Sequence, residues 1–429
     1  MKERIAIIDG LRTPFSKAGG TLAAYSADDL GTVAVRELMA RTGIKGSDLD
    51  EVIVGNVAQP ADSANVARVI ALKAGLPEGL IASTVHRNCA SGMESITTGA
   101  NRIAAGEANL ILAAGTESMS NIPLLFGRQM TRMFGQMMKA KTAWQRLGVW
   151  MGFRPSFLTP IIGVQVGLID PVCGLNMGQT AEILAREFGV TRLDQDAWAL
   201  RSHQRAAEAS AVQRLGDEIV PLPVPPQFDQ MMLTDDGFRA NQDMAALGKL
   251  RPYFDKVAGT VTVGNACPIT DGAGAVLLMS ESRAKAEGRT PLGYLREYAY
   301  AGLDGRRMGL GPVYATAKLM AKSGLSMADF DLIELNEAFA AQVLACGKAF
   351  ASDAYAQAHL GRSTALGSID PDKLNVNGGA IALGHPVGAT GSRLVVTLLK
   401  ELRRRGKQRG LATLCVSGGQ GAALALEVA

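Results

Sequence analysis

The sequence predicts an α/β protein that contains two copies of one structural unit. Its 429 residues are 47% hydrophobic but only 5% aromatic, and they include 49 glycines. This balance is typical of strands and helices that pack through Ala, Val, Leu and Gly, and it disfavours a β-sandwich or a coiled coil. Strand-like and helix-like stretches alternate along the chain, and a pattern from the first half recurs in the second. A chain of this length is expected to form two or three domains.

The first copy starts with a strand-like run at 5–8. Ser26 is a suitable N-cap for the helical pattern that follows, and Gly43 is a suitable helix end. Beyond the segment 46–56 we expect a strand at 83–87, a bend at 88–92, a helix at 93–105 and a buried strand at 109–114.

The second copy is visible because residues 326–336 match residues 46–56 at Asp48/Asp329, Asp50/Asp331, Val52/Ile333 and Val54/Leu335. An internal duplication is the simplest explanation. The same order then returns as a strand at 374–377, a glycine-rich bend around His385, a helix at 392–404 and a strand at 411–416. Cys89 and His385 thus occupy equivalent places. If the copies pack as pseudo-twofold partners, both residues face one cleft at the strand ends, where α/β sheets bind ligands.

Charge and cysteine usage narrow the function classes. The net charge is +4 without a long basic block, and the basic cluster at 403–409 follows an apolar helix, so we expect a solvated helix end and no nucleic-acid partner. The N-terminus runs into a strand without a signal sequence, which predicts a cytoplasmic protein. Five scattered cysteines fit neither a disulfide framework nor a metal site, so we expect reduced thiols and no metal.

Residues 122–168 form a basic segment rich in Met and aromatic residues. It carries Arg128, Arg132, Lys139, Lys141, Arg146 and Arg154 beside eleven Met, Phe and Trp side chains. The pattern leaves open a cover over an acyl-binding groove, a partner-docking surface, a peripheral membrane contact, or the ordinary core packing of an inserted helical pair. This segment belongs to an insertion, 119–250, in which we also expect helices at 180–188 and 194–211 and an irregular stretch at 221–248.

Three segments carry candidate chemistry. Cys89 lies at a strand-to-helix junction, where a helix N-terminus favours the thiolate that a nucleophilic cysteine needs. His385 lies in a glycine-rich bend in which Pro386 is expected to start a helix, and it is a candidate base. Cys415 precedes a run of turn-competent residues whose backbone N–H groups can bind an oxyanion.

These motifs together resemble the thiolase family, of the 3-ketoacyl-CoA thiolase (acetyl-CoA acyltransferase) type. The resemblance spans the whole chain and rests on residues 85–92, 177–182, 249–252, 259–266, 271–273, 336–339, 384–386 and the Cys415 loop. It implies a duplicated αβαβα five-layered core with an inserted loop domain. The implied domains are 1–118 plus 251–283 for the first core half, 119–250 for the loop domain and 284–429 for the second core half.

The resemblance also implies the site residues. Cys89 would attack the 3-keto carbon of a 3-oxoacyl-CoA, His385 would take its proton, and Cys415 would be the second acid/base. Asn336 would hold a water that forms one oxyanion hole with His385, and the backbone N–H groups of Cys89 and Ser417 would form the other.

By the same matching, Arg239 would contact CoA, and Met177 and Phe339 would line the acyl and pantetheine channel. Three positions depart from the common pattern: Cys267 stands where many thiolases have a serine near the pantetheine, Ser417 replaces a glycine, and Asn176 replaces a histidine of short-chain enzymes. CoA is expected as a substrate, with no permanently bound cofactor. Expected partners are a second copy, as homodimer or homotetramer, and a hydratase/dehydrogenase α-subunit.

The resemblance favours thiolytic cleavage in fatty acid β-oxidation. An acetyl-CoA C-acetyltransferase remains an alternative because condensation uses the same chemistry in reverse. A non-catalytic lipid-binding protein is disfavoured because Cys89, Asn336, His385 and Cys415 are all present, and a ketoacyl synthase is disfavoured because it lacks a second thiol such as Cys415.

Overall fold

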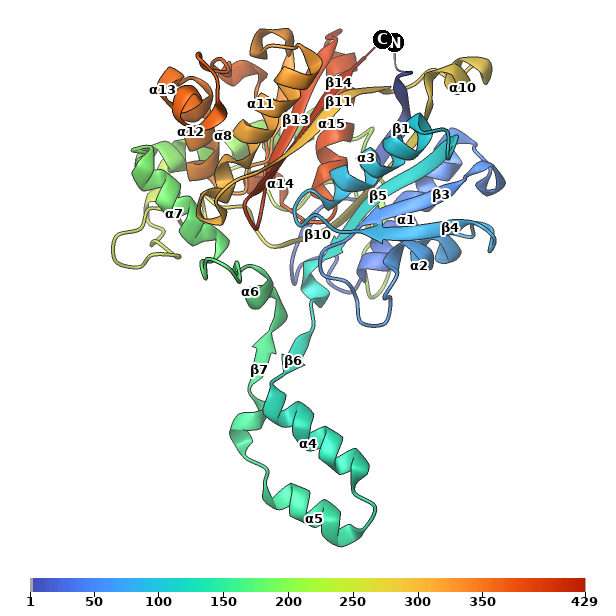
Figure 1. The fold of residues 1–429 in the computed structure, drawn as a ribbon, viewed down its shortest axis with the longest axis vertical. Helices are drawn as coiled ribbons and strands as arrows, with labels where there is room; N and C mark the ends of the chain where they lie inside the picture. The colour runs from blue at the N-terminus through green and yellow to red at the C-terminus, as the bar shows by residue number, and fades with distance from the viewer. Residues whose placement is uncertain (1–2, 429) are drawn as a thin grey trace.

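The computed structural model describes residues 3–428, which form a layered core and a projecting arm (Figure 1). One sheet runs through the core in the order β12-β13-β14-β11-β1-β10-β5-β3-β4. Its strands are β1 (Ile5–Arg12), β3 (Glu51–Gly55), β4 (Ile81–Val85), β5 (Leu110–Ser118), β10 (Thr270–Ser280), β11 (Gly293–Gly302), β12 (Leu332–Leu335), β13 (Arg409–Val416) and β14 (Gln420–Glu427), with the short β2 (Ser16–Lys17) beside β10.

The strand order is pseudo-twofold symmetric about the seam between β1 and β11. These two strands pair antiparallel only from Ile5 with Leu295 to Ile7 with Gly293. On one side β10, β5 and β3 follow β1, and on the other side β14, β13 and β12 follow β11 in equivalent places. β3 pairs parallel with β5, as β12 does with β13. The internal duplication predicted from the sequence therefore corresponds to two structural halves.

Helices make the core five layers thick. The core helices are α1 (Ala27–Thr42), α2 (Val66–Lys73), α3 (Ser91–Ala104), α10 (Glu281–Ala286), α11 (Gly311–Ser323), α12 (Ala340–Phe350), α13 (Asp353–Tyr355), α14 (Ala380–Leu383) and α15 (Thr390–Arg404). α1 and α2 cover one face of the first half-sheet, and α11 and α12 cover the outer face of the second. α3 and α15 lie between the half-sheets and pack on each other.

Alternating side chains bind these layers together. In β5, Leu110 and Leu112 face the outer helices, while Ile111 and Ala113 face the middle layer. Such a period of two with both faces buried is expected for a strand between two helix layers. The five-layered αβαβα core is confirmed.

One strand prediction is wrong. Of residues 374–377 only Leu374 makes a bridge, to Ile333, whereas β4 in the first half pairs with β3 over five residues. The reason is Asn375, which has φ +48°. Its side-chain Oδ1 accepts a hydrogen bond from the Leu335 N–H at 2.9 Å, and its Nδ2 donates one to the Leu335 carbonyl at 2.8 Å. The amide side chain thus replaces the strand ladder, and the chain turns off the sheet edge.

The insertion consists of β6 (Leu124–Phe126), α4 (Arg128–Lys139), α5 (Ala143–Met151), β7 (Pro160–Ile162), α6 (Gly163–Gly167), α7 (Met177–Glu187), α8 (Arg192–Ala211), β8 (Leu222–Pro223), β9 (Met231–Met232) and α9 (Met244–Gly248). The helices expected at 180–188 and 194–211 are present as α7 and α8, each with a capping box at its start. α7 packs on α12, and α8 packs on α14, so this part of the insertion covers the second half.

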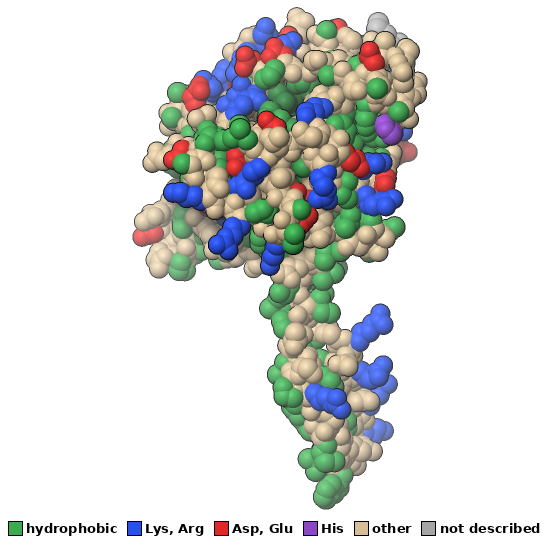
Figure 2. Space-filling view, turned by 90° about the vertical axis from the view of Figure 1, so that its left-hand side faces the viewer, with side chains coloured by type: hydrophobic (Ala, Val, Ile, Leu, Met, Phe, Trp, Pro, Cys, Tyr) green, Lys and Arg blue, Asp and Glu red, His purple; other side chains and the backbone are tan. Residues whose placement is uncertain are grey.

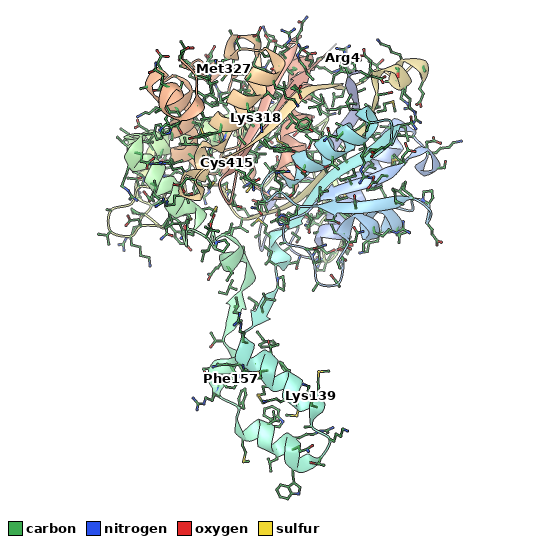
Figure 3. The ribbon with its side chains drawn as sticks, viewed as in Figure 1. Arg4, Lys139, Phe157, Lys318, Met327 and Cys415 are labelled. Atoms are coloured by element: carbon green, nitrogen blue, oxygen red, sulfur yellow. The ribbon has the colours of Figure 1, made fainter. Side chains whose placement is uncertain are left out.

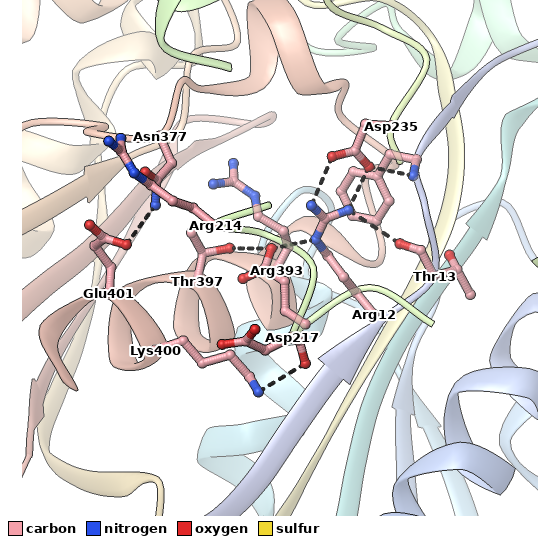
Figure 4. A network of polar contacts seen from close by, with 12 residues as sticks. Arg12, Thr13, Arg214, Asp217, Asp235, Asn377, Arg393, Thr397, Lys400 and Glu401 are labelled. Atoms are coloured by element: carbon pink, nitrogen blue, oxygen red, sulfur yellow. Dashed lines mark hydrogen bonds and ion pairs between the residues drawn. The ribbon is translucent and has the colours of Figure 1, made fainter. Parts of the chain in front are cut away.

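A buried ion cluster fastens the insertion to β1 (Figure 4). The Arg12 side chain, fully buried, donates to Glu218 Oε1 at 2.6 Å and to both Asp235 carboxylate oxygens at 2.6 and 2.8 Å. Thr397 of α15 donates to Glu218 Oε1 at 3.0 Å. The pKa of Arg12 is raised because its two carboxylate partners outweigh the burial that acts against its charge. β1, α15 and the insertion therefore share one buried polar contact.

The arm, residues 122–168, leaves the core through the paired strands β6 and β7 and ends in α4 and α5 (Figure 1). These helices pack mainly on each other and on residues beside them in the arm, not on the core. Of the four alternatives for this segment, ordinary core packing is therefore excluded. Figure 2 shows hydrophobic and basic side chains along the arm, and Met138 and Trp144 are 88% and 82% exposed. Across residues 3–428, no helix has the length and apolarity to span a bilayer.

Candidate active site

Cys89 lies in the turn between β4 and α3. Asn88, at φ +42°, bends the chain there, and its side-chain Nδ2 donates to the Ser417 carbonyl at 2.9 Å. The Cys89 side chain is partly exposed. Burial by its surroundings raises the pKa of Cys89 to about 11, although the backbone N–H groups of Ser417 and of Cys89 itself hydrogen-bond the thiol and lower it. Desolvation of the sulfur thus opposes the thiolate form that a helix N-terminus favours. Cys89 needs a base.

His385 supplies a neutral imidazole from the second half. The residue is 5% exposed, and burial lowers its pKa to about 3, with the Arg393 charge acting in the same direction. Its Nδ1 lies 2.6 Å from the Thr390 hydroxyl oxygen, and that hydroxyl donates to the Pro386 carbonyl at 3.0 Å. Because the single hydroxyl proton is used there, Nδ1 carries the imidazole proton and Nε2 presents a lone pair. A base is thereby oriented.

The helix expected to begin at Pro386 begins four residues later. Pro386 instead opens a turn in which its carbonyl accepts from the Ala389 and Thr390 N–H groups at 2.9 Å, and α15 starts at Thr390. This delay is what brings the Thr390 hydroxyl back to the His385 ring.

Asn336 follows β12 and is fully buried beside His385. Its Nδ2 lies 3.5 Å from His385 Nε2, the outer limit of a hydrogen bond, and its backbone N–H donates to the Thr413 carbonyl at 3.0 Å. Its Oδ1 has no hydrogen-bond partner within residues 3–428. The Asn336 amide and the His385 imidazole are therefore direct neighbours.

Cys415 lies near the end of β13 and is 1% exposed. It belongs to an apolar cluster that includes Met177, Phe254 and Phe339. Burial raises the pKa of Cys415, and the neighbouring Cys89, Cys346 and Cys267 thiols raise it further. The thiol therefore holds its proton in the resting protein. In Figure 3 Cys415 lies in the core, far from the arm residues Lys139 and Phe157.

The turn after Cys415 shows why a serine is tolerated at position 417. Positive φ values fall on Gly418 (+82°) and Gly419 (+75°), not on Ser417. Ser417 therefore keeps its N–H donor without backbone strain. Its N–H and carbonyl both bond the Asn88–Cys89 turn of the other half, so the two halves interlock at the thiol.

Comparison with known proteins decides the family. Residues 5–282 match the profile described as "Thiolase, N-terminal domain", and residues 289–428 match "Thiolase, C-terminal domain". This chain belongs to the thiolase family. It is an acyltransferase of the thiolase type.

Similar thiolases cover the whole chain. Curated proteins named 3-ketoacyl-CoA thiolase from Yersinia pestis (strain Pestoides F) and Yersinia pseudotuberculosis (strain YPIII) are 43% identical over 99% of this chain and 97% of theirs. The crystal structure of the Bacillus anthracis acetyl-CoA acetyltransferase is 36% identical with a TM-score of 0.87, covering 100% of this chain and 99% of that one. Human mitochondrial 3-ketoacyl-CoA thiolase in complex with CoA is 35% identical with a TM-score of 0.85, covering 100% and 98%.

The other predicted residues of this thiolase lie around the two cysteines. The Cys267 N–H donates to the Ala338 carbonyl at 3.1 Å, next to the bridge between Ala266 and Phe339. Burial raises the pKa of Cys267 to about 12, and Cys89 adds to the shift. Met177 is the first residue of α7, and Asn176 is its N-cap. Asn176, which replaces a histidine of short-chain enzymes, thus uses its side chain to cap this helix.

Arg239 is exposed and lies in a pocket of about 90 Å³ beside this group. The residues that line the pocket include Lys17 and His203. They also include Ala266 and Pro268, which are the chain neighbours of Cys267. Burial lowers the pKa of His203 to about 4, with Arg239 and Lys17 adding to the effect. The pocket therefore has two basic side chains, Lys17 and Arg239, and a neutral imidazole.

Sequence reasoning missed Thr390, which orients His385, and Thr270, whose hydroxyl accepts the His385 N–H at 3.0 Å. It also missed Lys17 in the basic pocket. Thr390 had a usable signal, because a hydroxyl at the first turn of the helix after a catalytic histidine can reach back to the ring. Lys17 and Thr270 gave none, since their positions depend on the β2–β10 pairing.

Proposed function

We propose that this thiolase is a 3-ketoacyl-CoA thiolase that cleaves 3-oxoacyl-CoA with CoA in fatty acid β-oxidation. One observation supports the proposal: the Cys89 turn of the first half bonds the Ser417 turn that follows Cys415, while Asn336 lies beside His385 in the second half. The two thiols are protonated and the imidazole is neutral, as the proposed roles require. The name of the 43% identical relatives supports the substrate class.

In the first half-reaction His385 Nε2 takes the Cys89 proton, and the sulfur adds to the C3 carbonyl carbon. The oxyanion that forms is stabilised by hydrogen-bond donors held in place before reaction. The C2–C3 bond then breaks, which leaves the acyl group on Cys89 and releases the acetyl-CoA enolate. Cys415 protonates the enolate at C2, which suits a buried thiol that holds its proton at rest.

In the second half-reaction the Cys415 thiolate removes the proton of an incoming CoA thiol. The CoA sulfur attacks the acyl-enzyme carbonyl, and the Cys89 sulfur leaves and regains its proton from His385. The shortened acyl-CoA is released, and both cysteines return to the thiol state. One oxyanion hole comprises the Cys89 and Ser417 N–H groups, and the other comprises His385 with a water held by Asn336.

CoA would bind through the pocket that Arg239 and Lys17 line. The CoA phosphates are anionic, and these two cations face a pocket whose His203 is neutral. Ala266 lines this pocket, and the next residue, Cys267, bonds the Ala338 carbonyl. The pantetheine would run along this stretch and reach Cys89 past Met177 and Phe339.

The substrate class is tested by CoA-dependent cleavage of 3-oxoacyl-CoA substrates from four to sixteen carbons, followed by loss of the enolate absorbance. Activity that extends beyond four carbons supports the proposal. Activity at four carbons alone would favour an acetyl-CoA C-acetyltransferase, for which the 0.87 TM-score to the Bacillus anthracis enzyme speaks. Intact CoA binding with no cleavage at any length would favour a non-catalytic lipid-binding protein.

We further propose that residues 119–250 act as a loop domain whose arm places this cytoplasmic enzyme on an anionic membrane surface. The arm carries six Lys and Arg and no Asp or Glu between Glu117 and Asp170. Its tip exposes Trp144, Trp150 and Met151. Aromatic side chains beside cations suit the interface of an anionic bilayer. The arm projects away from the core (Figure 1), which argues against its being a cover over an acyl-binding groove.

Vesicle flotation tests the arm. Vesicles that contain phosphatidylglycerol should retain the protein at low salt, neutral vesicles should retain less, and a Trp144→Ser/Trp150→Ser variant with normal turnover should stay in solution. Equal flotation of the variant and the natural protein would contradict membrane contact. Co-purification with a hydratase/dehydrogenase subunit that the same variant abolishes would assign the arm to that partner instead.

The edge strand β4 supports a homo-oligomer. It is the outermost strand of the first half-sheet, and Ile81 at its start is 60% exposed. An exposed apolar edge strand pairs readily with a copy of itself, and a twofold axis makes that pairing antiparallel. Analytical ultracentrifugation of an Ile81→Lys variant should show a shift from dimer or tetramer toward monomer.

A further inference from the structure

We propose that Glu117 is a positioning residue that clamps the His385 loop of the second half to the Asn56–Ala58 loop of the first. This inference rests on the proposed function, because it concerns how the base is held. Glu117 lies near the end of β5 and has 0% exposure. A carboxylate buried so completely needs its acceptor sites filled.

Four donors fill those sites. Glu117 Oε2 accepts from the Gly388 N–H at 2.9 Å and the Val57 N–H at 3.1 Å. Its Oε1 accepts from the Ala58 N–H at 2.9 Å and from Asn56 Nδ2 at 3.2 Å. One carboxylate therefore joins the segment after β3 to the loop that carries the base.

The backbone packs so tightly around Gly388 that a side chain there would not fit. A Cβ at Gly388 would lie 2.5 Å from the Thr116 carbonyl oxygen and 2.8 Å from Glu117 Oε2, and a Cβ at Gly115 would lie 2.3 Å from the Gly388 carbonyl oxygen. The end of β5 thus fixes the position of the His385 loop. Gly388 stands between His385 and Thr390, so its position sets the 2.6 Å contact that orients the imidazole.

The bonding pattern requires the ionised carboxylate. All four partners are donors, and a protonated Glu117 would direct its own O–H at one of them. Burial raises the pKa of Glu117 to about 7, and the N–H groups of Ala58, Val57 and Gly388 act in the opposite direction. Asp271 adds to the rise, and the Cys89 thiol is a further titratable group close enough to interact with Glu117. The clamp therefore holds fully only above that pKa and loosens as the pH falls through it.

The test compares Glu117→Gln and Glu117→Asp with a matched control. Gln turns an NH2 group toward two donors, and Asp keeps the charge but falls short by one methylene. A misplaced base costs about 10²-fold in rate, so kcat for 3-oxoacyl-CoA cleavage should fall by about 10- to 100-fold in Gln and less in Asp. The Kd for CoA, measured by calorimetry, should stay within about twofold of the natural protein because the basic pocket is untouched.

Glu51→Gln is the control, because Glu51 is a buried carboxylate of the same half-sheet at the far end of β3. It accepts from Ser83 Oγ at 2.8 Å and pairs with Arg102. That variant should lower Tm and keep kcat. The inference is overturned if both Glu117 variants keep kcat within about twofold, or if CoA affinity falls in step with kcat. Absence of cleavage by the natural protein would instead refute the proposed function.

Discussion

Thr390 accepts a hydrogen bond from His385 Nδ1 at 2.6 Å and donates its own hydroxyl hydrogen bond to the Pro386 carbonyl at 3.0 Å, which leaves the lone pair on Nε2. The tautomer of the imidazole is thus set by the hydroxyl of a fully buried neighbour. Orientation of an imidazole by its second nitrogen is a general requirement of histidine general bases.

Thr390→Val should reduce kcat by about 10- to 100-fold, because the isosteric side chain cannot accept from Nδ1 and the favoured tautomer is lost. Thr390→Ser, which keeps the hydroxyl, should recover most of the rate. Steady-state kinetics with saturating CoA measures both. Equal losses in the two variants would show that methyl packing, and not the hydroxyl, matters at this position.

Cys89→Ser should abolish cleavage while CoA binding persists. A serine hydroxyl is far harder to ionise than a thiol, and the neutral His385 is too weak a base to compensate. Single-turnover assays would detect acyl-enzyme in the natural protein and none in the variant. Substantial turnover by Cys89→Ser would contradict the nucleophile assignment.

Cys415→Ala should separate the two cysteine roles. Alkylation of Cys89 by an acyl-like haloacetyl thioester should proceed at close to the natural rate, since His385 still takes the Cys89 proton. Turnover should fall by at least about 10²-fold because enolate protonation has lost its donor. Mass spectrometry of the modified peptide and a cleavage assay give the two readouts, and parallel loss of both would refute distinct roles.

The lowered pKa of the buried His203 leads us to expect that the stability of the protein depends on pH. Its pKa is about 4 in the folded protein, below the ordinary value of 6.5, so between those values the unfolded chain binds the proton and the folded chain does not. Stability from this group is present above 6.5 and is lost as the pH falls toward 4, at up to about 1.4 kcal/mol per pH unit. The difference in unfolding free energy between the natural protein and His203→Gln should shrink from pH 7 to pH 5 in urea titrations. A constant difference would contradict burial of a neutral imidazole.

Arg12→Met should lower the free energy of unfolding by about 3–5 kcal/mol, because it leaves Glu218 and Asp235 buried without a cation. Arg214→Ala, which breaks an ion pair with the largely exposed Glu208, should cost under about 1 kcal/mol. Urea denaturation compares the two. Similar losses would mean that the buried cluster adds nothing beyond a surface pair.

Much of the fold was predictable because periodic patterns reflect local chemistry. Ser26 caps α1 and Gly43 ends it at φ +64°, as expected. The strand at 374–377 was not predictable, since Asn375 replaces ladder bonds by side-chain bonds to a strand forty residues earlier. Cys89, His385, Asn336 and Cys415 were named from motifs. The protonation states were not, because the high pKa of Cys89 arises from long-range packing that removes water and that no local motif encodes.

The seam between β1 and β11 joins two halves, each of which has a turn before a middle-layer helix. One turn carries Cys89, the proposed nucleophile, and the other carries His385, the proposed base. The two copies of the duplicated unit therefore carry different residues, with different proposed roles, at equivalent turns. Immediately after a duplication, the two turns would have carried identical residues. In the fused chain the two turns still influence each other through the α3–α15 contact, Glu117 and Ser417. A mutation in one turn need not be repeated in the other, however, so the two groups can change separately while the stoichiometry stays at one acyl group per chain.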